Sequence, residues 1–248
     1  MIISVAASLG GLKIIPLGRQ NPPQSRTAAH DIDQDNRTLS GRHIAESFAH
    51  EADPRACYPF FLWNCLWRSG ASILHGHAQM VLTRGMHYAK VEGWRQAALR
   101  YRAEHNAGYF ADLVAVHRAL GLAVEHGAVT ILPSLTPFKE KETTIIAPRL
   151  DADLKSAIYL VLNTFVKRLG VQSFNLGLYQ PPLSEVPESW EGFPFVVRII
   201  DRGGLQVKTS DVGSMEFFAQ SVVSTDPFRV VDELRKAAAL LPTDGRQA

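Results

Sequence analysis

Ile73-Leu74-His75-Gly76-His77-Ala78-Gln79-Met80 alternates apolar or small side chains with two imidazoles and an amide. Successive side chains of a β-strand point to opposite faces of its sheet. The alternation therefore predicts a half-buried strand over residues 73–82. On that strand His75, His77 and Gln79 share the polar face.

Two histidines at positions i and i+2 leave three interpretations open: a solvated strand face, a metal-binding pair, or a nucleophile. A useful fraction of imidazole is uncharged near neutral pH, so it can attack phosphorus and later leave. The phosphate oxygens then need nearby hydrogen-bond donors. The sequence offers the side chains of Gln79 and Ser72 and the turn amides of Gly70 and Ala71.

The remaining elements favour an antiparallel α+β arrangement, because strands follow one another in pairs between helices. Apolar spacing predicts helical structure over 91–126 with a break near 106–108. Asp151 is a good N-cap for a helix that ends at Gly170, and Asp226-Pro227 opens a last helix. Strands are expected at 57–64, 128–132, 143–147, 172–179 and 195–201, with one or two more in 1–20.

The composition limits which binding partners and which cellular compartment are expected. The 26 basic and 24 acidic side chains give a net charge of +2, which does not suggest nucleic acid as a partner. No apolar run reaches about 18 residues, so no membrane span is expected. Residues 1–7 lack the basic start of a signal peptide. Cys57 and Cys65 are expected to be core thiols in a cytoplasmic, reducing compartment.

The spacing from Asn64 through Gly70-Ala71-Ser72 to the His-x-His-x-Gln segment resembles the galactose-1-phosphate uridylyltransferase branch of the histidine-triad superfamily. The resemblance implies that His77 becomes covalently nucleotidylated and that Gln79 contacts its phosphate. It also implies that Asn64 and Ser72 bind the nucleotide phosphates.

The resemblance continues more weakly through three later segments, 137–148, 173–177 and 211–220, and it makes Glu216 a candidate acceptor for a sugar hydroxyl. It implies two histidine-triad-like halves with antiparallel sheets and packed helices. Residues 1–126 would carry the active-site motif, and residues 127–248 would lack catalytic histidines.

The sequence departs from the family pattern at three places. Gly76 stands where the uridylyltransferases proper usually have proline. No Cys-x-x-Cys zinc pair is seen, so His30 and His75 are the remaining zinc candidates, although a structural zinc site wants four ligands. Phe193-Pro194-Phe195 stands where some members have a second metal-binding histidine pair.

Two smaller expectations concern single side chains. Lys139 and Lys141 are interpreted as part of a solvated loop, with a phosphate contact as the alternative. Trp63 and Trp67 are expected in the core or in a homodimer interface, because large aromatic rings are favoured in both.

The combined expectation is a nucleotidyltransferase with ping-pong kinetics. A nucleoside-diphosphate sugar would give its nucleotide to His77, and a sugar-1-phosphate or inorganic phosphate would then take it. Two alternatives stay open at this point. One is a phosphorylase or hydrolase of nucleotide sugars or dinucleotides that uses the same histidine, and the other is an inactive nucleotide-binding protein.

Overall fold

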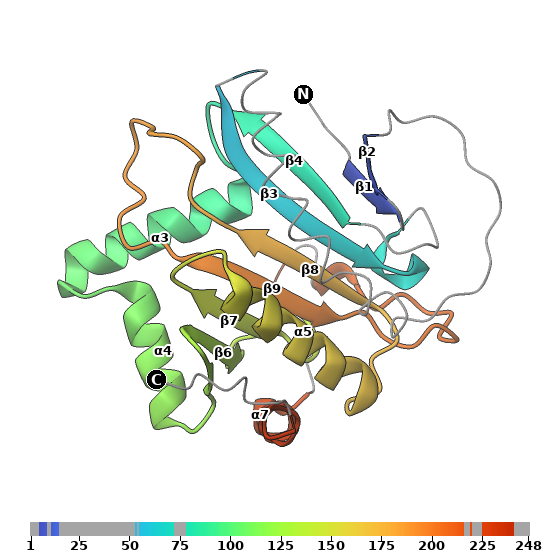
Figure 1. Cartoon of the computed structure of the whole chain (residues 1–248). Helices are drawn as coiled ribbons and strands as arrows, with labels where there is room; N and C mark the ends of the chain where they lie inside the picture. Colours follow the sequence, from blue (N-terminus) through green and yellow to red (C-terminus); the bar gives the residue numbers. More distant parts are fainter. Residues whose placement is uncertain are drawn as a thin grey trace, which may run out of the picture.

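One antiparallel sheet of seven strands organises the protein (Figure 1). The computed structural model describes residues 5–8, 11–14, 53, 55–71, 78–215, 219 and 225–240. The strands lie in the order β4-β3-β8-β9-β7-β6-β5. Their bounds are β3 Ala56–Cys65, β4 Ala78–Arg84, β5 Val124–His126, β6 Val129–Pro133, β7 Thr143–Ala147, β8 Phe174–Tyr179 and β9 Phe195–Asp201. A separate antiparallel pair joins β1 Val5–Ser8 to β2 Gly11–Ile14.

Four α-helices and one short 3-10 helix belong to the described residues: η1 Trp67–Ser69, α3 Ala89–His105, α4 Tyr109–Ala119, α5 Ala152–Lys167 and α7 Pro227–Ala238. The predicted caps are confirmed. The Asp151 side chain accepts hydrogen bonds from the amides of Asp153 and Leu154 at 3.1 and 3.3 Å. Asp226 accepts from the amide of Phe228 at 2.9 Å, with Pro227 as the first helical residue.

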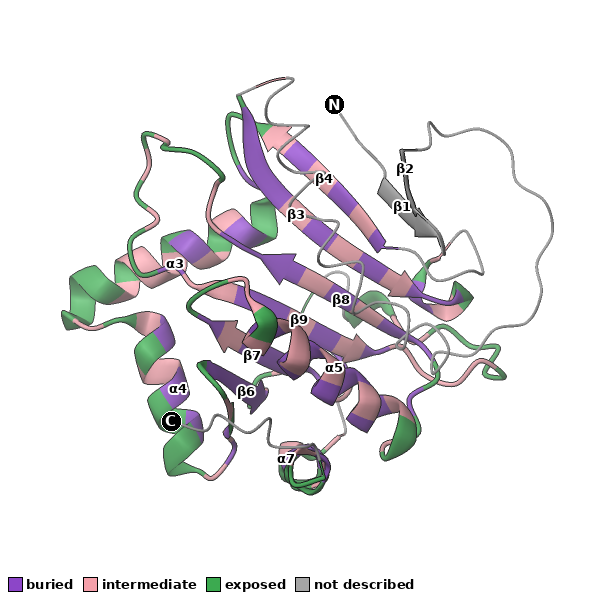
Figure 2. Ribbon diagram, in the orientation of Figure 1, coloured by how far each residue is buried: buried purple, intermediate pink, exposed green. Residues whose placement is uncertain are grey.

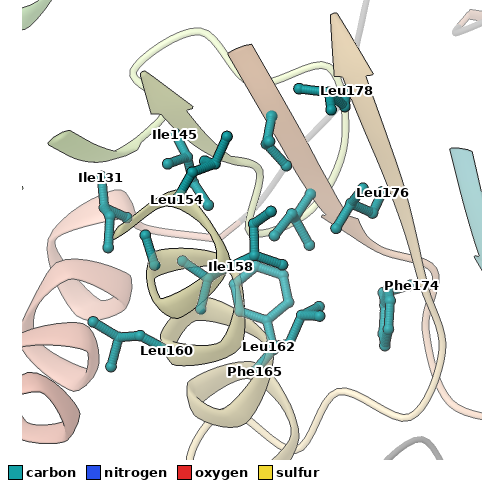
Figure 3. Close-up of a cluster of buried hydrophobic side chains, with 14 of the residues drawn as sticks. Ile131, Ile145, Leu154, Ile158, Leu160, Leu162, Phe165, Phe174, Leu176 and Leu178 are labelled. Atoms are coloured by element: carbon teal, nitrogen blue, oxygen red, sulfur yellow. The ribbon is translucent and has the colours of Figure 1, made fainter. Parts of the chain in front are cut away.

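The main core lies between α5 and one face of the sheet, called the α5 face below. Alternate residues of β3 and β8, such as Phe61, Trp63 and Phe174, point to this face and are buried. They form one cluster with the buried side of α5, including Phe165. Figure 3 shows the α5 side chains directed at the strands. Burial of this large apolar area is the main force that fixes α5 on the sheet.

Among the described residues, α3 covers part of the opposite face of the sheet, which is called the α3 face. Phe60, Tyr179 and Val196 alternate with the core residues along their strands and pack against Val91 and Trp94 of α3. Beyond this second cluster, the α3-face residues Leu62, Asn64, Gln79 and Asn175 are half-buried. Figure 2 shows buried and half-buried residues alternating along these strands. Polar side chains on this part of the sheet are therefore partly exposed while their backbone stays within the sheet.

The sheet continues across the expected boundary between the two halves. β5 from residues 1–126 pairs with β6, and β3 pairs with β8 from residues 127–248. The structure therefore confirms the α+β class and shows one unit around one seven-stranded sheet, without showing two separate histidine-triad-like halves. The division at residues 126 and 127 stays a prediction.

Most element predictions are confirmed, and one is wrong. Residues 124–126 form a strand instead of extending the helical region, because Val124 faces the core and the segment pairs with β6. Trp63 is 2% exposed and belongs to the core, whereas Trp67 is 49% exposed, so for Trp67 the homodimer interface stays a prediction. Cys57 and Cys65 are buried thiols, as expected. In the described part of the chain, no helix is both long and apolar enough to cross a membrane.

Candidate functional site

Two of the predicted site residues share the α3 face of the sheet. Leu62 on β3 pairs with Gln79 on β4, and Asn64 on β3 pairs with Asn175 on β8. Directly opposed residues of antiparallel strands point to the same face, and so do residues two apart on one strand. Asn64, Gln79 and Asn175 therefore lie on one face, and all three are half-buried.

A chain of polar contacts links Asn64 to the loop that follows β9. Asn175 Nδ2 donates to Asn64 Oδ1 at 2.6 Å and to the Ser69 carbonyl at 2.9 Å. Arg202 donates to Asn175 Oδ1 at 2.6 Å and to the two carboxylate oxygens of Asp211 at 2.7 and 3.1 Å. Burial opposes the charge of Asp211, but the hydrogen bonds and charge of Arg202 hold the pKa of Asp211 below its usual value. We call Asn64, Asn175, Arg202 and Asp211 the polar relay.

The turn after β3 is closed by its own backbone. Gly70 has φ 88° and donates its amide to the Trp67 carbonyl at 3.0 Å. The amide of Ala71 donates to the Leu66 carbonyl at 3.3 Å. Both amides are thus engaged inside the turn, which argues against the interpretation that they donate to a phosphate. What the turn offers instead is a fixed position for the Ser69 carbonyl.

The Asp211 segment is tied to this turn as well as to β9. Arg68 donates to the carbonyls of Val207 and Thr209 at 2.8 and 2.6 Å, and its Nη2 lies 4.0 Å from Asp211 Oδ1. Lys139 donates to the Asp211 carbonyl. Four segments that are far apart in the sequence therefore meet at one end of the sheet. They lie around residues 64–71, 137–142, 173–177 and 211.

The interpretation of Lys139 and Lys141 as a solvated loop is wrong. Lys139 is 6% exposed, and Lys141 pairs with Asp201 at 2.6 Å. The loop folds back against the end of β9, where the Asp201 amide donates to the Glu140 carbonyl at 3.0 Å. Glu142 is buried and accepts from Arg198 Nε at 2.5 Å. Lys139 is therefore buried, and the Lys141 side chain is only 21% exposed.

Several predicted site residues lie outside the described residues, namely His30, Ser72, His75, His77 and Glu216. The nucleophile, the zinc candidates and the sugar-hydroxyl acceptor are among them, so their roles stay predictions. Across the residues that the structure describes, no three His, Cys, Asp or Glu side chains are grouped so as to hold a metal ion.

Comparison with known proteins gives structural matches only. No family model matches the sequence, and no curated protein matches it. A solved uridylyltransferase superposes with a TM-score of 0.69 at 16% identity, covering 96% of this chain and 81% of that chain. The fold is shared with the uridylyltransferases. An ADP-glucose phosphorylase from Arabidopsis thaliana, solved with bound ADP-glucose, gives a TM-score of 0.66 at 16% identity, covering 87% and 70%.

A uridylyltransferase mutant gives a TM-score of 0.67 at 16% identity, covering 84% of this chain and 71% of that chain. At this level of identity the likeness concerns the fold, so the activity has to be argued from the residues of this chain.

The residues that the sequence interpretation missed are Asn175 and Arg202. Asn175 stands between Phe174 and Leu176, both buried, so strand alternation alone places it on the opposite face. A lone amide in an otherwise apolar strand is the signal that points to it. Arg202 gives no comparable signal, because a cation just after a strand is ordinary in a loop.

Proposed function

We propose that this protein is a nucleotidyltransferase that acts on a nucleoside-diphosphate sugar and a sugar-1-phosphate through a nucleotidyl-histidine intermediate. The observation that carries the proposal is the shared sheet face of Asn64 and Gln79, joined to Asp211 by the polar relay. The fold supports it, because it is shared with uridylyltransferases and with an ADP-glucose phosphorylase.

In the first step an imidazole nitrogen of His77 attacks the α-phosphorus. A P–N bond forms as the P–O bond to the sugar phosphate breaks, and sugar-1-phosphate leaves with the electron pair. In the second step an oxygen of the acceptor phosphate attacks the same phosphorus, and the P–N electron pair returns to the imidazole. Amide donors beside the phosphate stabilise the charge that concentrates on its oxygens.

The proposal assigns these donors to Gln79, Asn64 and Ser72. His75 belongs to the catalytic group because the sequence predicts it on the same strand face as His77 and Gln79. Glu216 is assigned to a sugar hydroxyl, and the turn at Gly70 and Ala71 contributes shape next to the phosphate. Zinc binding by His30 and His75 stays a prediction, and metal analysis of the purified protein tests it.

The test is covalent labelling of the full-length protein. UDP-glucose and ADP-glucose, each carrying radioactive phosphorus in the α-phosphate, are incubated with the protein and the protein-bound label is counted. We expect acid-labile label that His77→Ala abolishes. His105→Ala is the matched control, because the His105 side chain is 55% exposed and should label like the wild type. Folded wild-type protein that takes no label from any nucleotide sugar contradicts the proposal.

A phosphorylase that uses the same His77 is the second candidate. The likeness to the ADP-glucose phosphorylase favours it. Inorganic phosphate would then be the acceptor in the second step. Product analysis separates the two, because a phosphorylase releases nucleoside diphosphate only when phosphate is added, whereas a transferase needs the sugar-1-phosphate.

A further inference from the structure

The side-chain amide of Asn175 has only one orientation that satisfies its neighbours. A guanidinium group can only donate hydrogen bonds, and a backbone carbonyl can only accept them. Asn175 therefore turns Oδ1 to Arg202, at 2.6 Å, and Nδ2 to the Ser69 carbonyl, at 2.9 Å. Both contacts require the same orientation of the amide. The partners therefore determine which of its two atoms is oxygen and which is nitrogen, an assignment that is usually ambiguous.

Both partners of Asn175 are themselves held in place. Arg202 makes a two-pronged ion pair with Asp211, which fixes the plane of the guanidinium group. Ser69 is 4% exposed, and its hydroxyl and amide both donate to the Leu66 carbonyl, at 2.7 and 3.2 Å. Because neither partner can turn away cheaply, the orientation of Asn175 is rigid.

The orientation of Asn175 decides that of Asn64. Asn175 Nδ2 also donates to Asn64 Oδ1 at 2.6 Å. Asn64 must therefore direct its oxygen toward Asn175 and its NH2 group away from it. Within the described residues, no group accepts a hydrogen bond from that NH2 group. It lies on the half-buried part of the α3 face, next to the pair formed by Leu62 and Gln79.

We propose that Asn175 is a positioning residue that sets the polarity of the Asn64 amide, so that Asn64 presents its NH2 group to a ligand phosphate. This inference rests on the proposed function, which assigns Asn64 to the nucleotide phosphates. Phosphate oxygens accept hydrogen bonds, so a reversed Asn64 would direct an oxygen at them. Loss of a charge-assisted hydrogen bond weakens binding on the order of 10- to 100-fold.

A purely structural role for Asn175 makes a different prediction. In that case the Asn64–Asn175 contact only satisfies two half-buried amides, and removing it lowers stability. Any effect on ligand binding would then be the same whether or not position 64 carries an amide. The two roles are separated by a double-mutant cycle between positions 64 and 175.

The first experiment needs no ligand. Side-chain amide resonances of ¹⁵N-labelled protein report exchange of each NH2 group with water. In the wild type we expect the Asn175 NH2 to be protected and the Asn64 NH2 to exchange quickly. In Asn175→Asp the new carboxylate can only accept, so the Asn64 NH2 should become protected. A protected Asn64 NH2 and an unprotected Asn175 NH2 in the wild type overturn the inference.

The second experiment measures dissociation constants for UDP-glucose and ADP-glucose by calorimetry. Asn175→Asp and Asn64→Ala should each weaken binding on the order of 10- to 100-fold, and the double variant should bind no worse than Asn64→Ala. Losses that simply add, or an Asn175→Asp variant that binds like the wild type, overturn the inference. Wild type that binds neither nucleotide sugar contradicts the proposed function, while amide exchange still decides the polarity of Asn64.

Discussion

His87 is a buried histidine with little to stabilise a positive charge. Its side chain is 3% exposed and lies against the rings of Tyr58 and Trp190, with centroids 6.1 and 5.8 Å away. Nδ1 accepts a hydrogen bond from the Tyr88 amide at 2.8 Å, so Nδ1 carries no proton and the imidazole is neutral. Burial lowers the pKa of His87 to about 4.

This lowered pKa predicts a loss of stability in mild acid. Above pH of about 6.5 the imidazole is neutral in the folded and the unfolded chain. As the pH falls from there toward about 4, only the unfolded chain binds the proton, so the free energy of unfolding decreases. The expected loss from this group is about 3 kcal/mol. Urea unfolding at several pH values measures it.

His87→Asn is the control for that measurement, because its side-chain oxygen can still accept from the Tyr88 amide. The variant should lose about 3 kcal/mol less than the wild type between pH 7 and pH 4. Parallel pH profiles of the two proteins would contradict the assignment.

At the same scale, the sequence predicts only part of the site. Local strand alternation predicts the face of Gln79, whereas Asn64 is singled out by the family resemblance. The β3–β4 register then places Gln79 opposite Leu62, two residues before Asn64. Asn175 joins them only because β3 pairs with β8, more than a hundred residues further along the chain. Lys139 is misjudged for the same reason, since its burial depends on the distant Asp211 segment. Such contacts leave no periodic signal in one sequence.

The β5–β6 hairpin requires glycine at position 127 for two reasons. Gly127 has φ 58°, in the left-handed region that favours glycine. A Cβ atom there would also lie 2.5 Å from Cγ of Asp153, whose carboxylate accepts from the Ala128 amide at 3.0 Å. We expect Gly127→Ala to lower the free energy of unfolding by about 2–4 kcal/mol, as backbone strain and steric overlap add.

Gly85 separates the two contributions. Its φ is 76°, but a Cβ atom there would meet nothing within 4 Å. Gly85→Ala should therefore cost only the backbone strain, about 1 kcal/mol. Adding Asp153→Ala to Gly127→Ala should make the glycine substitution equally mild. Urea unfolding of the wild type, the two glycine variants, Asp153→Ala and the double variant tests this, and equal losses for the two glycine variants would refute the steric contribution.

The start of α5 depends on the carboxylate of Asp151, which accepts from the second and third amides of the helix. Asp151→Ala leaves these amides without that acceptor and should cost about 1 kcal/mol. Asp151→Asn keeps a side-chain oxygen at the cap and should cost much less. Thermal unfolding compares the two variants, and an equal loss would mean that the Arg149 ion pair at 3.1 Å matters more than the cap.

Local signals predict the elements because caps, glycines and apolar periods act within a few residues. Strands β7 and β9 and the helix starts at Asp151 and Asp226 follow from such signals. β5 does not, because a three-residue edge strand directly after a helical region has too few residues to show a period of two. It is defined by its pairing with β6.

At the scale of the whole molecule, one core joins residues from both sides of the expected boundary at 126 and 127. Phe61, Trp63 and Met80 from β3 and β4 belong to the same buried cluster as Phe165 from α5 and Val197 from β9. The strands of residues 127–248 occupy the middle of the sheet, between β3 and β5. Neither part can keep its buried surface without the other.

This shared core predicts one cooperative unfolding transition for both parts. Phe165 is fully buried, so Phe165→Ala should cost about 3–5 kcal/mol. Of the four tryptophans, Trp63, Trp67 and Trp94 precede residue 127. Their fluorescence should therefore report the same midpoint shift as far-UV circular dichroism, although the substitution lies on α5.

Phe228→Ala provides the matched control, because the Phe228 ring on α7 is 47% exposed and its loss should cost well under half as much. Two separate transitions in the wild type would contradict the single cooperative unit. So would a dichroism midpoint that moves in Phe165→Ala while the tryptophan midpoint stays in place, because residues 1–126 would then unfold without their partner strands.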